Sequence, residues 1–239
     1  MDRKFRKQIK DDPFRREFEH TVSWLDQNKE ALIRYGGIGL AALALGFGIY
    51  FFIGHQATVR ADALNHALLV DDATVGPAPS KPGGLAFPTQ ADKDKARGQA
   101  FSEVASKYHG DAEGAVAQMQ LASDAADKGD FATAERTYND IVNSAPKEYG
   151  AMAKLALANI YAGENKDADA EKLLRDLMAH PTLTVSKDEA AIHLAKLIAR
   201  NKSGCEEARK LLDPMRTERT AISRAAVTTL SQLSTCQGM

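Results

Sequence analysis

The residues that could do chemistry are few and far apart. The six histidines stand at positions 20, 55, 66, 109, 180 and 193. None of them belongs to an H-E-x-x-H motif or to a Cys/His spacing that could close a tetrahedral metal site. The sequence also lacks a G-x-S-x-G motif, a P-loop and a kinase signature. We therefore expect no catalytic residue, no metal, no cofactor and no small-molecule substrate.

A glycine-rich stretch, GGIGLAALALGFG at 36–48, offers one alternative. From Gly37 to Ala42 it fits G-x-G-x-x-A, the turn that binds a dinucleotide. That turn follows a hydrophobic strand, but residues 27–35 are charged and helical in character. The stretch instead opens an uncharged run from Tyr35 to Ile53, 53 − 35 + 1 = 19 residues. As a helix this run is about 28 Å long, close to the roughly 30 Å of a hydrocarbon core.

The apolar run predicts a transmembrane helix at 35–54. A cleaved signal peptide is the alternative, but 34 mostly polar residues precede the run, so an uncleaved anchor is favoured. Four basic residues stand closely before the span and only Arg60 follows it within a comparable distance, which predicts that the N-terminus is in the cytoplasm and the rest outside. The four are Arg15, Arg16, Lys29 and Arg34.

Small residues within the span could let another helix approach. Gly37 with Ala41, and Ala42 with Gly46, form small-x-x-x-small pairs. The alternative is that glycine and alanine are simply common in such spans. Before the span, apolar residues at three- and four-residue steps predict an amphipathic helix over 14–34.

The remainder of the chain predicts an all-α fold. Four prolines and three glycines between 76 and 88 argue against any helix or strand there. Helix starts of the S/T-x-x-D/E kind begin at Thr89, Ser186 and Ser203. The net charge of −1 and pI near 6.6 disfavour a nucleic-acid partner.

A pattern of small and bulky residues repeats from 112 to 215. Displaced by 36 positions, Ala122, Ala134 and Tyr138 become Ala158, Ala170 and Leu174, and a third copy follows less regularly. This layout predicts tetratricopeptide-like helix pairs stacked as an α-solenoid. We expect the packing positions also to lie beside a partner groove: Leu121, Ala122, Ala125, Ala134, Tyr138, Ala158, Tyr161, Ala170 and Leu174.

The sequence also predicts the helices at the two ends of the stack. Residues 57–72 and 91–108 predict a degenerate first pair, and residues 219–235 predict a capping helix with an apolar face. That face consists of Ile222, Ala226, Val227, Leu230 and Leu233. The predicted layout is a cytoplasmic segment at 1–34, the span at 35–54, membrane-proximal helices at 55–110 with a loop at 74–90, and repeats at 111–239.

Two cysteines, Cys205 and Cys236, complete the set of reactive residues. Outside the cytoplasm an even number of cysteines is expected to pair. Closing about 32 residues would stabilise the fold by roughly 3 kcal/mol. A plain helical hairpin would instead place Cys205 opposite a residue near 229, so both the paired and the free state stay open.

With anchor, orientation and repeats in place, the chain resembles the YfgM-like family. The resemblance rests on Trp24-Leu25-Asp26-Gln27-Asn28-Lys29 directly before the span, and on the Leu121-Ala122 and Gly129-Asp130-Phe131-x-x-Ala134 pattern of the repeats. Members of that family are ancillary subunits of the bacterial Sec translocon with a periplasmic repeat domain. The longer charged N-terminus, the Pro/Gly loop and the two cysteines depart from it.

The resemblance implies a single-pass inner-membrane protein that links exported proteins to periplasmic chaperones. Its expected partners are membrane lipid, translocon subunits and chaperones. The same repeats are similar to those of the periplasmic cell-division coordinator of the Tol-Pal system, which gives an alternative function. Independently of both, the residues predict a protein-binding scaffold without catalytic groups.

Overall fold

The computed structural model describes residues 29–217 and 221–233. Two compact units meet in the sequence between Thr58 and Val59, and we describe each by itself. Within the described residues the secondary structure is almost entirely helical, which confirms the all-α prediction. The part of the predicted amphipathic helix that precedes Lys29 lies outside the described residues.

A single helix, α3 (Lys29–Asp71), contains the apolar span and continues beyond it. Its residues 29–58 form the described part of the first unit, and the side chains of the apolar span are exposed. The helix is long and apolar enough to cross a membrane. Its last residues belong to the second unit, where Ala67 and Val70 are buried.

A short parallel pairing closes the loop that follows α3. Strand β1 (Thr74–Val75) pairs with β2 (Ala86–Phe87), with Thr74 opposite Ala86. The prediction that the stretch 76–88 contains no strand is therefore wrong at Ala86–Phe87. This dipeptide falls in the proline-free stretch between Pro82 and Pro88, so both of its backbone amides can donate hydrogen bonds.

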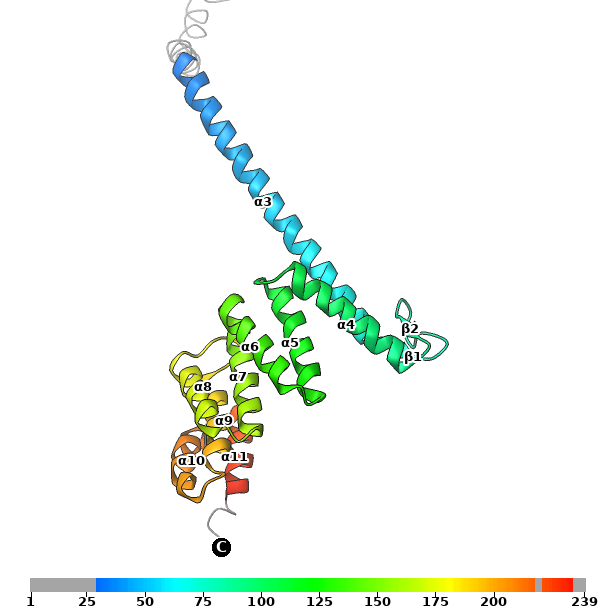
Figure 1. Cartoon of the computed structure of the whole chain (residues 1–239). Helices are drawn as coiled ribbons and strands as arrows, with labels where there is room; N and C mark the ends of the chain where they lie inside the picture. Colours follow the sequence, from blue (N-terminus) through cyan, green and yellow to red (C-terminus); the bar gives the residue numbers. More distant parts are fainter. Residues whose placement is uncertain (1–28, 218–220, 234–239) are drawn as a thin grey trace, which may run out of the picture. The chain divides into compact units, whose positions relative to one another are not determined.

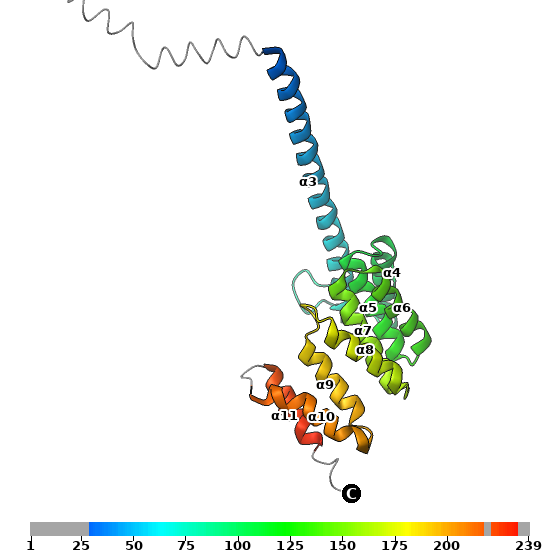
Figure 2. The ribbon, with the colours of Figure 1, turned by 90° about the vertical axis from the view of Figure 1, so that its left-hand side faces the viewer.

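The second unit continues as a series of helices, each packed from α4 onward against the next (Figures 1 and 2). Their bounds are α4 (Gln90–Lys107), α5 (Ala112–Asp127), α6 (Phe131–Ser144), α7 (Lys147–Gly163), α8 (Asp167–Ala179), α9 (Lys187–Ile198), α10 (Cys205–Leu212) and α11 (Ala221–Leu233). Two 3₁₀ turns flank α10: η1 (Lys202–Gly204) and η2 (Asp213–Thr217).

The predicted helix starts are correct at two of three positions. The hydroxyls of Thr89 and Ser186 accept hydrogen bonds from the backbone N–H groups three residues later, at 3.1 Å each. Ser203 does not cap a helix. It lies inside η1, and α10 begins two residues later with Gly204 as its cap residue, because the 3₁₀ turn already leads the chain into the helix.

The 36-residue displacement is visible in the backbone turns. Gly129 between α5 and α6 has φ +79°, and Asn165 between α7 and α8 has φ +61°. These residues are 165 − 129 = 36 positions apart. Both occupy the left-handed region, which glycine and asparagine tolerate best and which lets a short turn reverse the chain. The two helix pairs therefore share one turn geometry.

Three hydrophobic clusters run through the repeats. One joins α5, α6 and α7 around Ala134, Ile141 and Leu157; a second joins α7, α8 and α9 around Ala170 and Leu194. A third joins α9, α10 and α11 around Leu212. Because each cluster takes residues from two successive pairs, no pair hides its apolar surface without its neighbour.

The predicted first pair has a core of its own. Ala67 of α3 lies with Phe101, Val104 and Ala105 of α4, and Ala117 of α5 joins them. Apolar residues at the end of α3 therefore pack directly against α4.

The capping helix α11 covers the other end of the stack. Ala226 and Leu233 are buried, and Ile222 and Leu230 pack against the same cluster. The predicted apolar face is wrong at one position, since Val227 is 45% exposed. Thr229, which the apolar pattern passed over, is buried instead. The buried stripe is rotated slightly from the predicted one.

Candidate protein-binding surface

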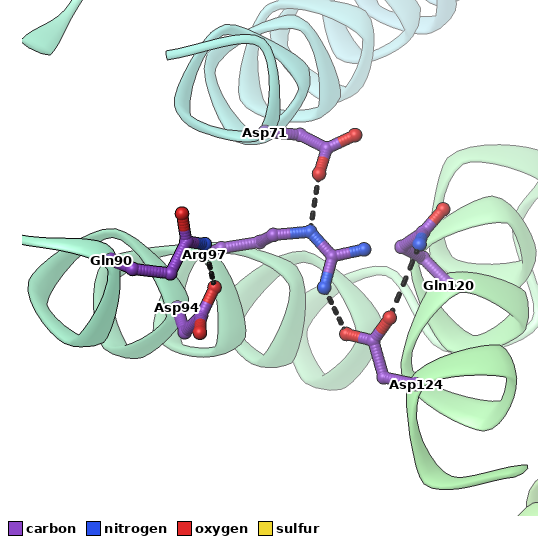
Figure 3. A network of polar contacts seen from close by, with 6 residues as sticks. All are labelled: Asp71, Gln90, Asp94, Arg97, Gln120 and Asp124. Carbon is purple, nitrogen blue, oxygen red and sulfur yellow. Dashed lines mark hydrogen bonds and ion pairs between the residues drawn. The ribbon is translucent and has the colours of Figure 1, made fainter. Parts of the chain in front are cut away.

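An arginine joins the first helix pair to the second. The Arg97 side chain on α4 forms ion pairs with Asp71 at the end of α3 and with Asp124 on α5 (Figure 3). Gln120 donates a hydrogen bond to the second Asp124 oxygen at 3.4 Å. The guanidinium also lies 5.5 Å from the centre of the Phe101 ring. One side chain therefore ties three helices.

The protonation of Arg97 follows from these contacts. Burial alone would lower the pKa of the guanidinium, but the hydrogen bonds to Asp124 and Asp71 outweigh it and raise the pKa. The arginine therefore keeps its charge. Two carboxylates therefore compensate the charge of a guanidinium whose side chain is only 18% exposed.

A cleft of about 410 Å³ opens beside this junction, lined by α4, α5 and the α5–α6 turn. Leu121 and Ala125 provide its apolar wall. The charged residues around them are mostly acidic: Asp94, Asp124, Asp127, Asp130, Arg97 and Lys128. An apolar wall with an acidic rim suits a polypeptide segment that carries both apolar and basic side chains.

The predicted packing residues divide into two groups. Six of them are buried in the cores, and their side chains fill the space between helices: Ala122, Ala134, Tyr138, Ala158, Ala170 and Leu174. Three keep exposed surface and can line a groove: Leu121, Ala125 and Tyr161. Leu121 and Ala125 lie together in the cleft beside Arg97, while Tyr161 belongs to the next repeat.

Tyr161 lies in a polar cluster between α6 and α7. Its hydroxyl donates to a Glu135 oxygen at 2.7 Å, and the Lys166 ammonium lies 5.3 Å from the centre of its ring. Burial raises the pKa of Tyr161, and the hydrogen bond to Glu135 adds to the rise. The phenol therefore stays protonated and available as a donor.

Further polar contacts join neighbouring helices, and the sequence analysis did not find them. Lys154 on α7 donates to Asp176 on α8 at 2.6 Å, and His193 on α9 lies 3.0 Å from the Asn159 side-chain oxygen. Similarly, Gln118 donates to Asp140 at 2.6 Å. Their sequence separations, 22 and 34 residues in the first two cases, match neighbouring helices of a solenoid and no local motif.

The small residues of the span lie on two sides of α3. At about 100° per residue, Gly37 and Ala41 lie roughly 140° around the helix from Ala42 and Gly46. The four residues therefore do not form a single face. A Cβ added at Gly37 or Gly46 would meet no other atom within 4 Å, so both positions are open for an approaching helix.

The predicted disulfide stays a prediction. Cys205 begins α10 and is buried at 8% exposure, whereas Cys236 lies outside the described residues. Within residues 29–217 and 221–233, no group of three or more histidine, cysteine, aspartate or glutamate side chains could hold a metal ion.

Comparison with known proteins agrees with the architecture. The model of the tetratricopeptide repeat-like domain family matches residues 23–181, which is more than half of the chain. No curated protein and no solved structure matches the chain. Domains of this family are typically non-enzymatic scaffolds for protein–protein interaction. The chain belongs to the tetratricopeptide repeat-like domain family.

Proposed function

We propose that the chain is an anchored, non-enzymatic scaffold of the bacterial inner membrane that binds other polypeptides on its periplasmic repeats. We further propose that it serves as an ancillary subunit of the Sec translocon and links exported proteins to chaperones. The observation that carries the proposal is α3, since one helix holds a span-length apolar run and then contributes buried residues to the first repeat.

The cleft beside Arg97 supports a binding role for the repeats. Its apolar wall of Leu121 and Ala125 stays partly exposed, whereas Ala115, Ala117 and Ala122 of the same helix are buried. The carboxylates around that wall are complementary to the basic residues of a bound segment. Basic and apolar side chains in one segment are the chemistry that we expect in a partner.

Site-specific crosslinking in native membranes tests this function. A photo-crosslinker at Leu121 or Tyr161 should capture translocon subunits, chaperones or exported chains. Tyr138 provides a matched control, because it lies on α6 with only 6% exposure and should capture nothing. Equal capture from Tyr138 would show unfolded protein. Recovery of cell-division proteins alone would support the coordinator of the Tol-Pal type instead.

A span swap separates the two parts of the scaffold. Residues 35–54 are replaced by an unrelated transmembrane helix, and complexes from solubilised membranes are compared by mass spectrometry. Partners that survive the swap bind the repeats, and partners that vanish bind the anchor. If neither chain recovers any envelope protein, the scaffold proposal fails.

A further inference from the structure

A second cleft lies at the capping end of the stack and has a volume of about 470 Å³. Its walls come from α10, from the 3₁₀ turn η2 and from the second half of α11. We call it the cap cleft, and it is lined by Arg209, Asp213, Arg216, Val227, Leu230 and Ser231. None of these residues lines the cleft beside Arg97, so the two clefts are separate.

One wall of the cap cleft is apolar. Val227 is 45% exposed, and Leu230 keeps part of its surface open although it also packs on the last hydrophobic cluster. The two residues are three positions apart on α11, so their side chains lie about 60° apart around the helix and form one strip. An apolar side chain of a partner would remove this strip from water, which favours association.

Arginines surround the apolar strip. Arg209 of α10 is half-buried and donates a hydrogen bond to the Leu233 carbonyl oxygen at 3.5 Å, which holds its guanidinium beside the end of α11. Arg216 of η2 is 63% exposed. Arg224 is exposed and lies one turn before Val227 on the same side of α11. Two arginines therefore line the cleft, and a third stands beside it.

Within the part of the chain that the structure describes, carboxylates compensate these arginines only weakly. The Asp213 carboxylate is 58% exposed and approaches Arg216 at 3.9 Å. Neither Arg209 nor Arg224 forms an ion pair with another described residue. By contrast, the arginines of α8 and of the turn after α9 have carboxylate oxygens at 2.7–3.0 Å. The cap cleft therefore keeps positive charge that a partner can neutralise.

An apolar strip among incompletely paired arginines is complementary to a polypeptide segment with acidic and apolar side chains. An anionic bilayer surface also combines negative charge with an apolar interior. However, the end of α3 joins this unit at its first helix pair, whereas α11 covers its last repeat. Within the unit, the cap cleft and the helix that carries the span therefore lie at opposite ends of the stack. This position favours a polypeptide segment as the occupant.

We propose that the cap cleft binds an acidic, apolar segment of a second polypeptide, separately from the basic, apolar segment expected beside Arg97. The opposite charges of the two clefts keep each segment from the other site, since like charges repel. One stack then holds two different polypeptides at once, as a link between exported chains and chaperones requires. This inference rests on the proposed function, but its test uses only the purified chain.

Peptide binding to the full chain in nonionic detergent tests the proposal. The probe is a short peptide in which leucine and glutamate alternate, labelled with an uncharged fluorophore, and fluorescence anisotropy measures its dissociation constant. The wild type should bind it, and Arg216→Glu should weaken binding about tenfold or more, because a like charge replaces an opposite one. Val227→Asp should also weaken it. A peptide of leucine and glutamine should bind the wild type less tightly than the acidic probe.

Matched controls assign the effect to the cap cleft. Lys172→Glu reverses a charge in the same way at an exposed position of α8 and should leave binding of the acidic probe unchanged. Asp127→Lys, at the rim of the cleft beside Arg97, should weaken binding of a leucine–lysine peptide and spare the acidic probe. Circular dichroism establishes that each variant is folded.

Three results would overturn the proposal. The wild type does not bind the acidic probe, or both cap-cleft variants bind it as the wild type does, or phosphatidylglycerol added to the micelles displaces it, which would assign the cleft to lipid. The proposed function fails separately. If the probe binds in the cap cleft but native membranes yield no translocon subunit, chaperone or exported chain, the cleft stands and the translocon role falls.

Discussion

Two glycines in neighbouring helices should respond in opposite ways to substitution by alanine. Gly114, the third residue of α5, has the Tyr108 carbonyl where its Cβ would stand, whereas Gly98 in the middle of α4 has no atom within 4 Å of that position. Helix propensity alone favours alanine at both sites by about 0.5–1 kcal/mol. Only the packing distinguishes them.

We therefore expect Gly114→Ala to destabilise the second unit by about 2 kcal/mol or more, because backbone cannot move away as a flexible side chain does. Gly98→Ala should stabilise it by about 0.5–1 kcal/mol. Urea unfolding of both variants measures the difference. A Gly114→Ala protein as stable as Gly98→Ala would contradict the close approach of α5 to Tyr108.

His193 gives a pH dependence that can be assigned to one residue. Burial lowers its pKa below 6.5, and Lys196 lowers it further against the opposing effect of Glu189. The unfolded chain then binds the proton more tightly than the folded one. The contribution of His193 to the free energy of unfolding should therefore become less favourable as the pH falls from 6.5 to the pKa of the folded state. Below that pKa it should not change further.

A His193→Gln variant should remove this component. The difference in free energy of unfolding between wild type and variant, measured by urea titration at several pH values, should vary across that window and be constant above it. An invariant difference would show that His193 titrates equally in both states.

At the scale of elements, two substitutions in the capping helix α11 test which of its faces is buried. Leu233→Ala should cost about 2 kcal/mol or more, since it removes a buried side chain at 6% exposure from the last cluster. Val227→Ala on the same helix should change stability by only about 0.5 kcal/mol or less, because Val227 is 45% exposed. Thermal unfolding of both variants measures this, and equal losses would restore the face predicted from the sequence.

The sequence was sufficient for elements whose signals are local or periodic. The 36-residue displacement predicted the repeats, and the same displacement relates Gly129 to Asn165. Ser203 shows where local signals fail, since a capping motif works only if the chain enters the helix directly and here a 3₁₀ turn comes first. Val227 and Thr229 show that hydrophobicity alone does not give the rotation of a short terminal helix.

The Arg97 junction could not have been predicted by spacing. Asp71 and Asp124 lie 26 and 27 residues away along the chain, in helices whose approach depends on the loop at 74–90 and on Gly114. The acidic cleft has the same origin, because its residues come from α4, α5 and the following turn. Sequence reasoning found Leu121 and Ala125 as apolar positions but not the carboxylates around them.

For the molecule as a whole, the family match ends before the stack of helices does. The match ends at residue 181, between α8 and α9, while the same packing continues through α9, α10 and α11. The third, less regular copy of the repeat therefore belongs to the stack although it departs from the family pattern. Stacking requires each helix pair to offer an apolar surface that fits its neighbour. It does not require every repeat to have the same length in the sequence.

The topology of the whole chain is a further prediction. The excess of basic residues before the span should place the N-terminus in the cytoplasm. In spheroplasts, added protease should digest a C-terminal tag and spare an N-terminal one; inverted vesicles should give the opposite result. Protection of both tags in spheroplasts would mean that the chain does not cross the membrane in the predicted direction.

The junction of α3, α4 and α5 also sets an order of assembly. During synthesis Asp71 emerges first, then Arg97, and Asp124 only after another 27 residues. Until α5 has formed, the arginine is matched by one carboxylate and Phe101 lacks part of its cover. The chain therefore completes its first pair only by beginning its second. A chain arrested between α4 and α5 would therefore leave part of the apolar surface of α4 uncovered.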